Sequence, residues 1–406
     1  MKVLIFSQYF WPESFRINEV SETLLKKGIE VEVLTGKPNY PVGKIFSKYQ
    51  IWGCQSETYK GVWINRIPML PRGGGSGWRL AMNYLSFVVS GMLFAPWMLR
   101  KKKFDIVFVY GVSPILQAIP AIFLGRLKKC PIVLWVQDLW PESLSATGYV
   151  KNRFVIDLVG KTVQFIYRHV DLLLVQSRAF EEPVEALASG TPIIYYPNSV
   201  DDIFLSDTSS AMPEIPGLDK DFSILFAGNI GTAQAVEVIV EAASLLVGYN
   251  EIHFIVVGDG SCQEWMLQEI QRRGLSNLHL PGRFPVEMMP GFMQKASALL
   301  VTLADKPIFA ATVPNKIQAY MASGKPIIAC LNGEGARLVI ESEAGFAVPA
   351  ENAKSLVSAI LRLYEMDPEK RQKLGENGRE YYRKHFDHNR LIDQLIEYFK
   401  KVSGKG

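Results

Sequence analysis

A chain of 406 residues is too long for one ordinary hydrophobic core, and two domains of about 200 residues each are the natural expectation. With 48% hydrophobic and 21% charged residues, the composition excludes a disordered chain. Residues 1–200 carry 23 Lys and Arg against 14 Asp and Glu, whereas the remainder carries 21 against 26. The basic first half predicts an anionic partner; without a basic helix that interleaves aromatic residues, nucleic acid is not expected.

The cysteines and the first residues of the chain favour a cytoplasmic location. Cys54, Cys130, Cys262 and Cys330 are scattered, without the spacing of a disulfide framework or a metal site, and this fits a reducing compartment. Met1 leads almost directly into an apolar run with no basic n-region or cleavage site, so we expect no export signal.

In chain order, residues 1–200 alternate short apolar runs with helical patterns. This alternation is typical of a parallel sheet with helices on both faces, so we expect a first Rossmann-like domain here. Residues 201–219, rich in Asn, Ser, Asp and Pro, are the expected linker. The expected strands of the first domain are Val3–Ser7, Glu30–Leu34, Ile106–Tyr110, Ile132–Gln137, Leu172–Gln176 and Ile193–Tyr196.

The alternation restarts after the linker, and residues 220–385 are predicted to form a second Rossmann-like domain. Residues 386–406 contain an amphipathic stretch, which predicts a closing helix that can pack back on the first domain. The expected strands of the second domain lie within 223–231, 252–260, 278–284, 298–303, 325–330 and 345–349.

Residues 78–104 of the first domain are unusually apolar. The stretch Tyr84–Leu99 has no charged residue but is only 16 residues long, whereas a bilayer crossing needs about 20. It is followed by the basic run Arg100–Lys103, and tryptophans stand near the ends of the segment. That pattern is typical of a helix at the level of lipid headgroups. We expect interfacial membrane contact, with a buried helix and a true span as the alternatives.

Two strand ends of the first domain carry residues that fit a ligand site. The loop after the first strand contains Glu13, Arg16 and Asn18, which we expect to contact an acceptor, because such loops form the ligand crevice of open α/β sheets. Asp138 and Glu142 follow the buried run IVLWV. A desolvated carboxylate there is costly unless a sugar hydroxyl or a developing positive charge pairs with it. We interpret both as catalytic candidates; a structural Asp that caps the next helix is the alternative.

The second domain offers a candidate diphosphate site. The turn Gly228–Gly231 joins a strand to a helix, and its small residues would let backbone N–H groups approach a phosphate. Lys316 falls in the first turn of the helix expected after Pro314, where a cation opposes the helix dipole unless an anion binds there. We therefore predict that Lys316 holds a diphosphate, with Arg283 as a second cation. A solvated surface lysine is the alternative.

Motifs of several other enzyme classes are absent from the sequence. The five histidines form no HxH or HExxH group, so we expect no metal and no other cofactor. No Gly-x-Ser-x-Gly element and no Walker loop occurs, which argues against a serine hydrolase and a P-loop NTPase.

Taken together, these segments resemble the retaining glycosyltransferases of family 4. That family has the GT-B fold, an α/β architecture of two Rossmann-like domains that face each other across a cleft. The resemblance covers nearly the whole chain, through the runs YFWPE, QDLWPE, AGNIG, VGDG and PNKIQAYMASGKPII. Within the family, the chain is most similar to bacterial N-acetyl-L-fucosaminyl transferases of O-antigen and capsule assembly.

The resemblance implies a UDP-sugar donor and a polyprenol-diphosphate-linked glycan acceptor. It also implies a peripheral position on the inner face of the plasma membrane, with the anionic membrane surface as a partner. Asp138 would stand near the donor sugar. The donor-binding residues that the resemblance implies are Gly228, Asn229, Gly231 and Lys316 at the diphosphate, Arg283 and Phe284 beside the nucleobase, and Glu341 near the nucleotide end.

The chain departs from the family pattern at charged positions. Relatives commonly have an Arg and a Lys on the diphosphate where this chain has Asn229 and Gln234, and two glutamates where it has Ala311 and Ala319. We expect Lys316, with the second cation named above, to supply the missing charge. The alternatives are a catalytically weakened subunit that only binds a sugar nucleotide, and a UDP-sugar epimerase.

Overall fold

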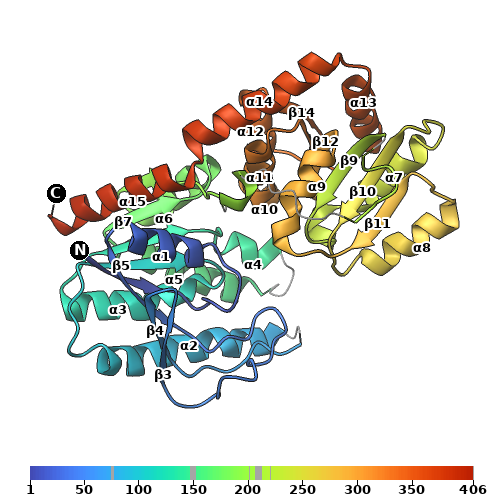
Figure 1. The fold of residues 1–406 in the computed structure, drawn as a ribbon. Coiled ribbons are helices and arrows are strands. Elements are labelled where there is room, and N and C mark those ends of the chain that lie inside the picture. Colours follow the sequence, from blue (N-terminus) through green and yellow to red (C-terminus); the bar gives the residue numbers. More distant parts are fainter. Residues whose placement is uncertain (75–76, 147–151, 201, 206–212, 220, 406) are drawn as a thin grey trace. The chain divides into compact units, whose positions relative to one another are not determined.

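The computed structural model describes residues 1–74, 77–146, 152–200, 202–205, 213–219 and 221–405 (Figure 1). The chain divides into two compact units, one formed by residues 1–197 with 389–406 and the other by residues 198–388. Each unit contains a sheet of mainly parallel strands covered by helices on both faces. The predicted class, two Rossmann-like α/β domains, is confirmed.

The first unit is built on an eight-stranded sheet with the order β3-β4-β2-β1-β5-β6-β7-β8. All described neighbours pair in parallel except β3 and β4, an antiparallel hairpin that the sequence analysis did not predict. The strands are β1 (Lys2–Phe6), β2 (Glu30–Thr35), β3 (Gln55–Tyr59), β4 (Val62–Arg66), β5 (Ile106–Gly111), β6 (Ile132–Val136), β7 (Leu172–Val175) and β8 (Ile193–Tyr195).

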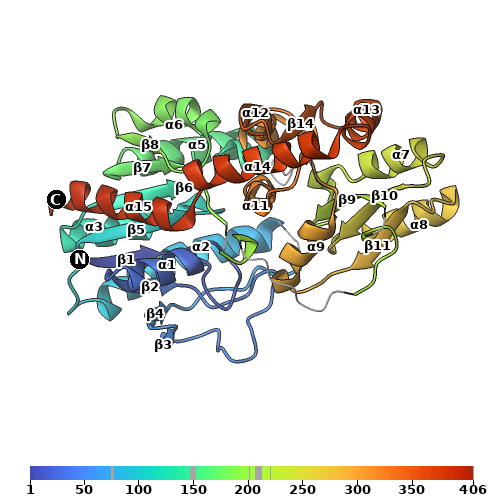
Figure 2. The ribbon, with the colours of Figure 1, turned by 45° about the horizontal axis from the view of Figure 1, so that its top comes forward.

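Two helical layers cover this sheet (Figures 1 and 2). Helices α1 and α15 pack on one face, and α2, α3 and α5 lie along the other. The α-helices of the unit are α1 (Ile17–Lys26), α2 (Gly77–Met98), α3 (Ala118–Lys128), α4 (Glu142–Ala146), α5 (Arg153–Tyr167), α6 (Glu181–Ala188) and α15 (His388–Ser403), with short 3-10 helices at Ile115–Gln117 and Arg178–Phe180.

The C-terminal helix α15 shares the core of the first unit. Leu395 and Phe399 are fully buried in the same apolar cluster as residues of β1, β2 and β5. The ring of Phe399 meets Phe108 edge-on, with 5.2 Å between ring centroids. The hydroxyl of Tyr196 donates a hydrogen bond to the carbonyl of Leu391 at 2.9 Å. The last helix is therefore part of the structural core that positions the loops of the first unit.

Helix α2 has one buried face and one exposed face. Its buried residues include Asn83, Phe87 and Gly91, and a Cβ on Gly91 would lie 2.7 Å from Pro120 of α3. Among the described residues it is the one helix long and apolar enough to cross a membrane, a property of length and composition that core helices share. Because one face is packed into the unit while the other is open, α2 is neither a wholly buried helix nor an isolated apolar segment.

The second unit contains a six-stranded sheet, all of whose neighbouring strands are parallel, in the order β11-β10-β9-β12-β13-β14. Its side chains form one apolar cluster on each face of the sheet. The strands are β9 (Phe222–Ala227), β10 (Ile252–Val257), β11 (Leu278–Gly282), β12 (Ala298–Thr302), β13 (Ile327–Cys330) and β14 (Gly345–Val348).

Part of the expected linker 201–219 lies outside the described residues. Its described ends belong to the second unit: Phe204, Ile215 and Leu218 pack in one of the two clusters. The helices of this unit are α7 (Glu237–Leu245), α8 (Gln263–Arg273), α9 (Met289–Lys295), α10 (Pro307–Ala311), α11 (Asn315–Ser323), α12 (Glu334–Glu341), α13 (Ala353–Tyr364) and α14 (Pro368–His385), with 3-10 helices at Asp202–Leu205, Thr232–Gln234 and Val286–Met288.

Replacing Phe399 with Ala tests the contribution of α15 to the first unit. The variant loses a fully buried ring, and we expect its free energy of unfolding to fall by about 3–5 kcal/mol in a denaturant titration. Lys401→Ala, on the exposed side of the same helix, should change it by less than about 0.5 kcal/mol. Equal effects of the two substitutions would mean that α15 does not stabilise the unit through this ring.

Candidate active site

In each unit the order in which successive strands are added to the sheet reverses at one central strand. In the first unit β1 lies between β2 and β5, and in the second β9 lies between β10 and β12. Ligands of open α/β sheets bind beyond the carboxyl ends of the strands at such a switch point. Each unit therefore has its own candidate site: the loops after β1, β5 and β6 in the first unit, and the loops after β9 and β12 in the second.

Tyr320 of α11 keeps the switch point of the second unit open. Strands β9 and β12 pair only at Ile224 and Leu225 of β9. Beyond them, the hydroxyl of Tyr320 accepts a hydrogen bond from the backbone N–H of Ala227 at 3.1 Å. A side chain from α11 thus takes the place of a backbone hydrogen bond between β9 and β12. The two strands separate before their carboxyl ends, and α11 packs where they separate.

Glycines bring the strand ends and α11 into close contact at this point. A Cβ on Gly258, whose φ is 148°, would lie 1.8 Å from the carbonyl oxygen of Gly228. Gly228 has a φ of 137°, and a Cβ there would lie 3.0 Å from Nζ of Lys316. The turn is tied to the loop after β10, because Ile230 N–H donates to the carbonyl of Asp259 at 2.7 Å. Position 228 therefore requires glycine, because another residue would be strained at this φ and its Cβ would crowd Lys316.

Lys316 lies in the first turn of α11, as the sequence predicts, and its ammonium group is buried. Its Nζ has no hydrogen-bond partner among the described residues. The nearest favourable contact is the ring of Phe226, with Nζ 3.5 Å from the centroid. Burial lowers the pKa of Lys316 from 10.5 to about 7. A cation held without a counter-ion beside a glycine turn is suited to an anionic ligand.

Asn229 and Gln234, at which the sequence departs from the charge pattern of the family it resembles, lie together in the structure. The side-chain amide of Asn229 donates to Oε1 of Gln234 at 2.9 Å. A Cβ on Gly231 would lie 2.6 Å from Nδ2 of Asn229, so this glycine accommodates the amide pair. The turn therefore presents a neutral pair, and Lys316 is the cation nearest to it.

The other predicted donor residues are less well placed. Arg283 is 74% exposed and pairs with Asp259 at 3.2 Å, which puts it beside the glycine turn. Phe284 is half-buried against Phe292. Glu341 is the last residue of α12, next to the start of β14, and accepts from Tyr381 at 2.7 Å. It lies at the amino ends of the strands, whereas the glycine turn lies at their carboxyl ends. The structure therefore does not bring Glu341 to the predicted donor site.

In the first unit, Asp138 stands directly after β6 in a small hydrogen-bond network. Its Oδ2 accepts from both the backbone N–H and the hydroxyl of Ser113, each at 2.9 Å. The indole of Trp140 donates to the same hydroxyl at 3.1 Å. Burial raises the pKa of Asp138, and the bonds from Ser113 oppose that rise. The network orients the carboxyl group while Oδ1 makes no hydrogen bond to the described residues.

Arg16 and Glu142 are two further predicted site residues of the first unit. Arg16 directly precedes α1, and Glu142 is the first residue of α4. Nε and Nη1 of Arg16 are buried without a hydrogen-bond partner among the described residues, although Nη1 is 3.8 Å from a carboxylate oxygen of Glu19. Arg16 therefore keeps donors for a ligand, whereas Glu142 is exposed at the start of α4.

Glu13 and Asn18 hold the loop after β1 in place. The carboxylate of Glu13 accepts backbone N–H bonds from Asn39 at 2.8 Å, Tyr40 at 2.7 Å and Phe10 at 3.3 Å. Asn18 donates to the carbonyl of Glu13 at 2.8 Å. Burial raises the pKa of Glu13 to about 7 despite these bonds. Both side chains have structural partners, and their predicted contact with an acceptor stays a prediction.

Sequence reasoning missed the polar residues that close the switch point of the first unit. The backbone N–H of Gln8 donates to Oε1 of Gln117 at 2.7 Å, and the Gln8 amide donates to Oδ1 of Asn83 at 2.8 Å. All three side chains are buried, and they come from the loop after β1, from α2 and from the 3-10 helix after β5. The only signal in the sequence is a polar residue inside an otherwise apolar segment, as at Asn83.

Comparison with known proteins agrees with this geometry. Residues 14–198 match the family described as "Glycosyl transferase 4-like domain", and residues 221–366 match the family described as "Glycosyl transferases group 1". Solved glycosyltransferases of the GT-B fold align over the full length of the chain. The chain belongs to the GT-B glycosyltransferases.

Three similar proteins illustrate the range of this glycosyltransferase fold. WcaI of Escherichia coli K12, provisionally named a colanic acid biosynthesis glycosyl transferase, is 25% identical over 415 residues, covering 98% of this chain and 99% of its own. Sucrose-phosphate synthase of Thermosynechococcus elongatus is 16% identical, with a TM-score of 0.74 and coverage of 100% and 99%. HepE of Anabaena in complex with UDP is 15% identical, with a TM-score of 0.72 and coverage of 99% and 100%.

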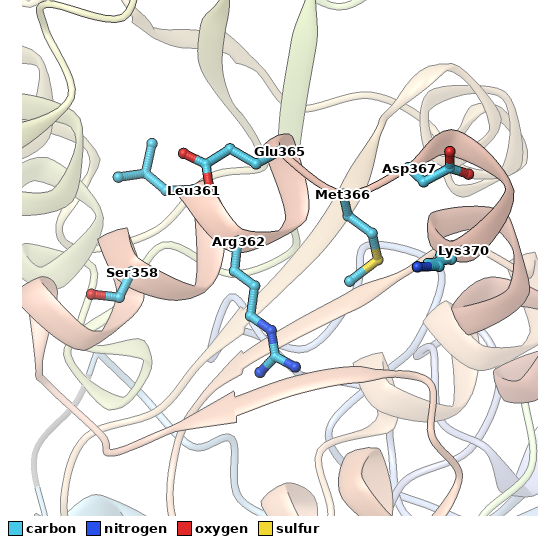
Figure 3. Close-up of a pocket in the computed structure, with 7 residues that line it drawn as sticks. All are labelled: Ser358, Leu361, Arg362, Glu365, Met366, Asp367 and Lys370. Atoms are coloured by element: carbon cyan, nitrogen blue, oxygen red, sulfur yellow. The ribbon is translucent and has the colours of Figure 1, made fainter.

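A hollow elsewhere on the glycosyltransferase does not meet the requirements of a donor site. It has a volume of about 570 Å³ and lies between the end of α13 and the start of α14 (Figure 3). Helix α13 follows the carboxyl end of β14, so the end of α13 is at the opposite edge of the sheet from the glycine turn. Basic Arg362 and Lys370 alternate there with acidic Glu365 and Asp367, a mixture that does not select an anion.

The buried carboxyl group of Glu13 should give the stability of the enzyme a pH dependence. Because its pKa is raised to about 7 in the folded state, the folded protein holds a proton that the unfolded chain loses near pH 4.5. The free energy of unfolding should therefore fall by about 1–3 kcal/mol between pH 4.5 and pH 7.5. Glu13→Gln should lack this part of the slope in parallel urea titrations. Identical slopes in the two proteins would contradict the assigned pKa.

Proposed function

We propose that the chain is a retaining glycosyltransferase that moves a sugar from a UDP-sugar to a lipid-linked glycan during O-antigen or capsule synthesis. The observation that carries the proposal is the buried, unpartnered ammonium of Lys316 beside the glycine turn of the second unit. The UDP bound by HepE supports the nucleotide, and the name of WcaI supports polysaccharide synthesis. The family resemblance favours an N-acetylated deoxyhexosamine such as N-acetyl-L-fucosamine.

Two features of the second unit favour a diphosphate at Lys316. The first is the ammonium, for which a diphosphate would be both counter-ion and hydrogen-bond acceptor. The second is the N-terminus of α11, a nine-residue helix that begins at Asn315 and whose dipole favours an anion. The neutral pair Asn229 and Gln234 can offer amide hydrogen bonds but no charge. We infer that Lys316 replaces the two cations that relatives place in the turn.

The proposed reaction breaks the bond between C1 of the sugar and the β-phosphate oxygen of UDP, and the electron pair leaves with that oxygen. An acceptor hydroxyl forms the new bond to C1 on the same face of the sugar and gives its proton to the departing phosphate. Stabilisation of the leaving group by Lys316 and the helix terminus lowers the barrier. Asp138, held through Ser113, would orient the sugar and stabilise positive charge that develops at C1.

Within the described ranges of the chain, no three His, Cys, Asp or Glu residues lie together as metal ligands. The proposal assigns the stabilisation of the leaving diphosphate to Lys316, with Arg283 close to the same turn.

The experiment that tests the function is a screen of UDP release. Purified protein would be incubated with a panel of UDP-, GDP- and dTDP-sugars, with and without lipid-linked glycans extracted from bacterial membranes. The proposal expects UDP release from one UDP-sugar that depends on the lipid acceptor. Conversion of the donor without an acceptor would indicate an epimerase instead. UDP binding without any turnover would indicate a subunit that only binds.

Replacing Lys316 with Met tests the diphosphate site by two opposite effects. The variant keeps the apolar volume and removes a buried charge, so we expect it to be more stable than the wild type at neutral pH. UDP affinity should fall by about 10- to 100-fold, the worth of charge-assisted hydrogen bonds. Calorimetric titration with UDP measures the second effect and thermal unfolding the first. Lys373→Met, on the exposed side of α14, is the matched control. Unchanged UDP affinity in Lys316→Met would exclude the assignment.

Replacing Asp138 with Asn separates catalysis from donor binding. The substitution keeps the shape and removes the negative charge, so kcat should fall by at least about 100-fold. UDP affinity should stay within about twofold, because the proposed diphosphate site is in the second unit. Steady-state UDP release and UDP titration measure the two quantities. Asp393→Asn, exposed on α15, is the control. Full activity of Asp138→Asn would leave the carboxylate with a structural role only.

A further inference from the structure

Helix α2 presents a continuous apolar stripe to solvent. Six large apolar side chains, 42–67% exposed, recur every three or four residues along the helix. That spacing places them on one face of a helix. The opposite face is buried against the unit, so the stripe points away from the sheet. Its members are Trp78, Met82, Leu85, Val89, Leu93 and Trp97.

The two neighbouring helices also expose apolar side chains. Helix α3 packs beside α2 and presents exposed Phe123 and Leu127, and α5 next to it presents exposed Phe154 and Leu158. All three helices cover the same side of the first sheet, the side away from α1 and α15 (Figures 1 and 2). Contiguous exposed apolar surface of this extent marks a contact with a partner or a membrane. We call this surface the α2–α3–α5 face.

Cationic residues border the α2–α3–α5 face, and its three helices contain one acidic residue, exposed Asp157 of α5. Exposed Arg100, Lys101 and Lys103 follow α2, and exposed Arg126 and Lys129 stand at the end of α3. Between Glu57 and Asp138 the only acidic residue of the sequence is Asp105. Each Lys or Arg near an anionic bilayer contributes about 1 kcal/mol of attraction.

We propose that the α2–α3–α5 face docks the protein on an anionic lipid bilayer, with α2 lying in the plane of the interface. Trp78 and Trp97 at the two ends of α2 suit the headgroup level. Contact with a second copy of this face is disfavoured, because α2 and α3 contain no acidic residue and would bring like charges together. The proposal extends the expectation for residues 78–104 to three helices and assigns the contact to side chains on their outer surface.

The buried side of α2 excludes a spanning role. Phe87 meets Phe6 of β1 edge-on at 5.8 Å, and Asn83 donates to the carbonyl of Leu70 at 2.5 Å. Withdrawing α2 into a bilayer would break these contacts and expose the core. The bond between Asn83 and Gln8 also joins α2 to the loop after β1, part of the candidate site. Docking by α2 would thus hold this loop near the surface in which a lipid-linked acceptor resides.

Vesicle flotation tests the proposal. It deepens the proposed function, on which its purpose rests, but the measurement needs neither donor nor acceptor, so the two can fail separately. Wild-type protein should float with vesicles of 30% phosphatidylglycerol in phosphatidylcholine. Flotation should drop at least tenfold with pure phosphatidylcholine. The same loss is expected at high salt, since salt screens the cationic border.

Three sets of variants divide the face into its parts. Leu85→Gln with Val89→Gln and Leu93→Gln removes the stripe, and we expect flotation to fall at least tenfold. Phe123→Gln with Leu127→Gln and Leu158→Gln tests the extension to α3 and α5, with the same expectation. Arg100→Gln with Lys101→Gln and Lys103→Gln should abolish the preference for phosphatidylglycerol.

A control variant also replaces three exposed apolar residues, but all three lie in the second unit. Leu245→Gln with Val286→Gln and Ile340→Gln, each 47–62% exposed in the wild type, should float like the wild type. Circular dichroism checks that every variant is folded, and Leu93→Gln alone, at a position 65% exposed, replaces the first triple variant if that one unfolds.

Two results would overturn the proposal: wild-type protein that does not float with anionic vesicles, or stripe variants that float as well as the wild type. A wild-type dimer in solution that the stripe variants convert to monomers would assign the face to a second copy instead. Loss with the first set but not with the second would overturn the three-helix surface.

Discussion

The proposed function depends on the ammonium group of Lys316, which is buried without a counter-ion. Lowering a lysine pKa from 10.5 to about 7 implies a cost of a few kcal/mol for holding that charge. The surrounding structure enforces this cost: Tyr320 from the same helix is hydrogen-bonded to the end of β9, and Gly228 leaves no Cβ to displace the lysine. An unpaired buried charge of this kind is typical of functional sites, where a bound ligand supplies the missing counter-charge.

The candidate sites of the two units hold a buried ionisable group in different ways. In the second unit an unpaired cation stands beside a neutral amide pair, so its affinity for an anion comes from one residue. In the first unit Asp138 has lost solvent but gained two hydrogen bonds from Ser113, which fix its direction. In the proposed reaction negative charge develops on the diphosphate and positive charge on the sugar, so the proposal gives the cation to the first and the carboxyl group to the second.

Much of the fold could be predicted from the sequence, because buried parallel strands are continuous apolar runs. The hairpin of β3 and β4 could not, since QSETY is polar except for its last residue and VWINR has only three apolar residues, so neither segment is a continuous apolar run. Lys316 could be found because a cation in the first turn of a helix opposes its dipole. The role of Glu13 could not, because its partners Asn39 and Tyr40 lie on another loop. Glu341 was chosen by family resemblance, and only the course of α12 shows that it ends at the far edge of the sheet.

The ionisation of Lys316 is the most direct test of the central claim. Nuclear magnetic resonance of protein labelled with ¹³C at lysine Cε would follow the lysine side chains, with Lys316→Met to assign the signal of Lys316. The account predicts a pKa near 7 in the unliganded protein and a rise of two or more units, to about 9 or higher, when UDP is bound. A signal that titrates near 10.5, or one that UDP leaves unchanged, would contradict the account.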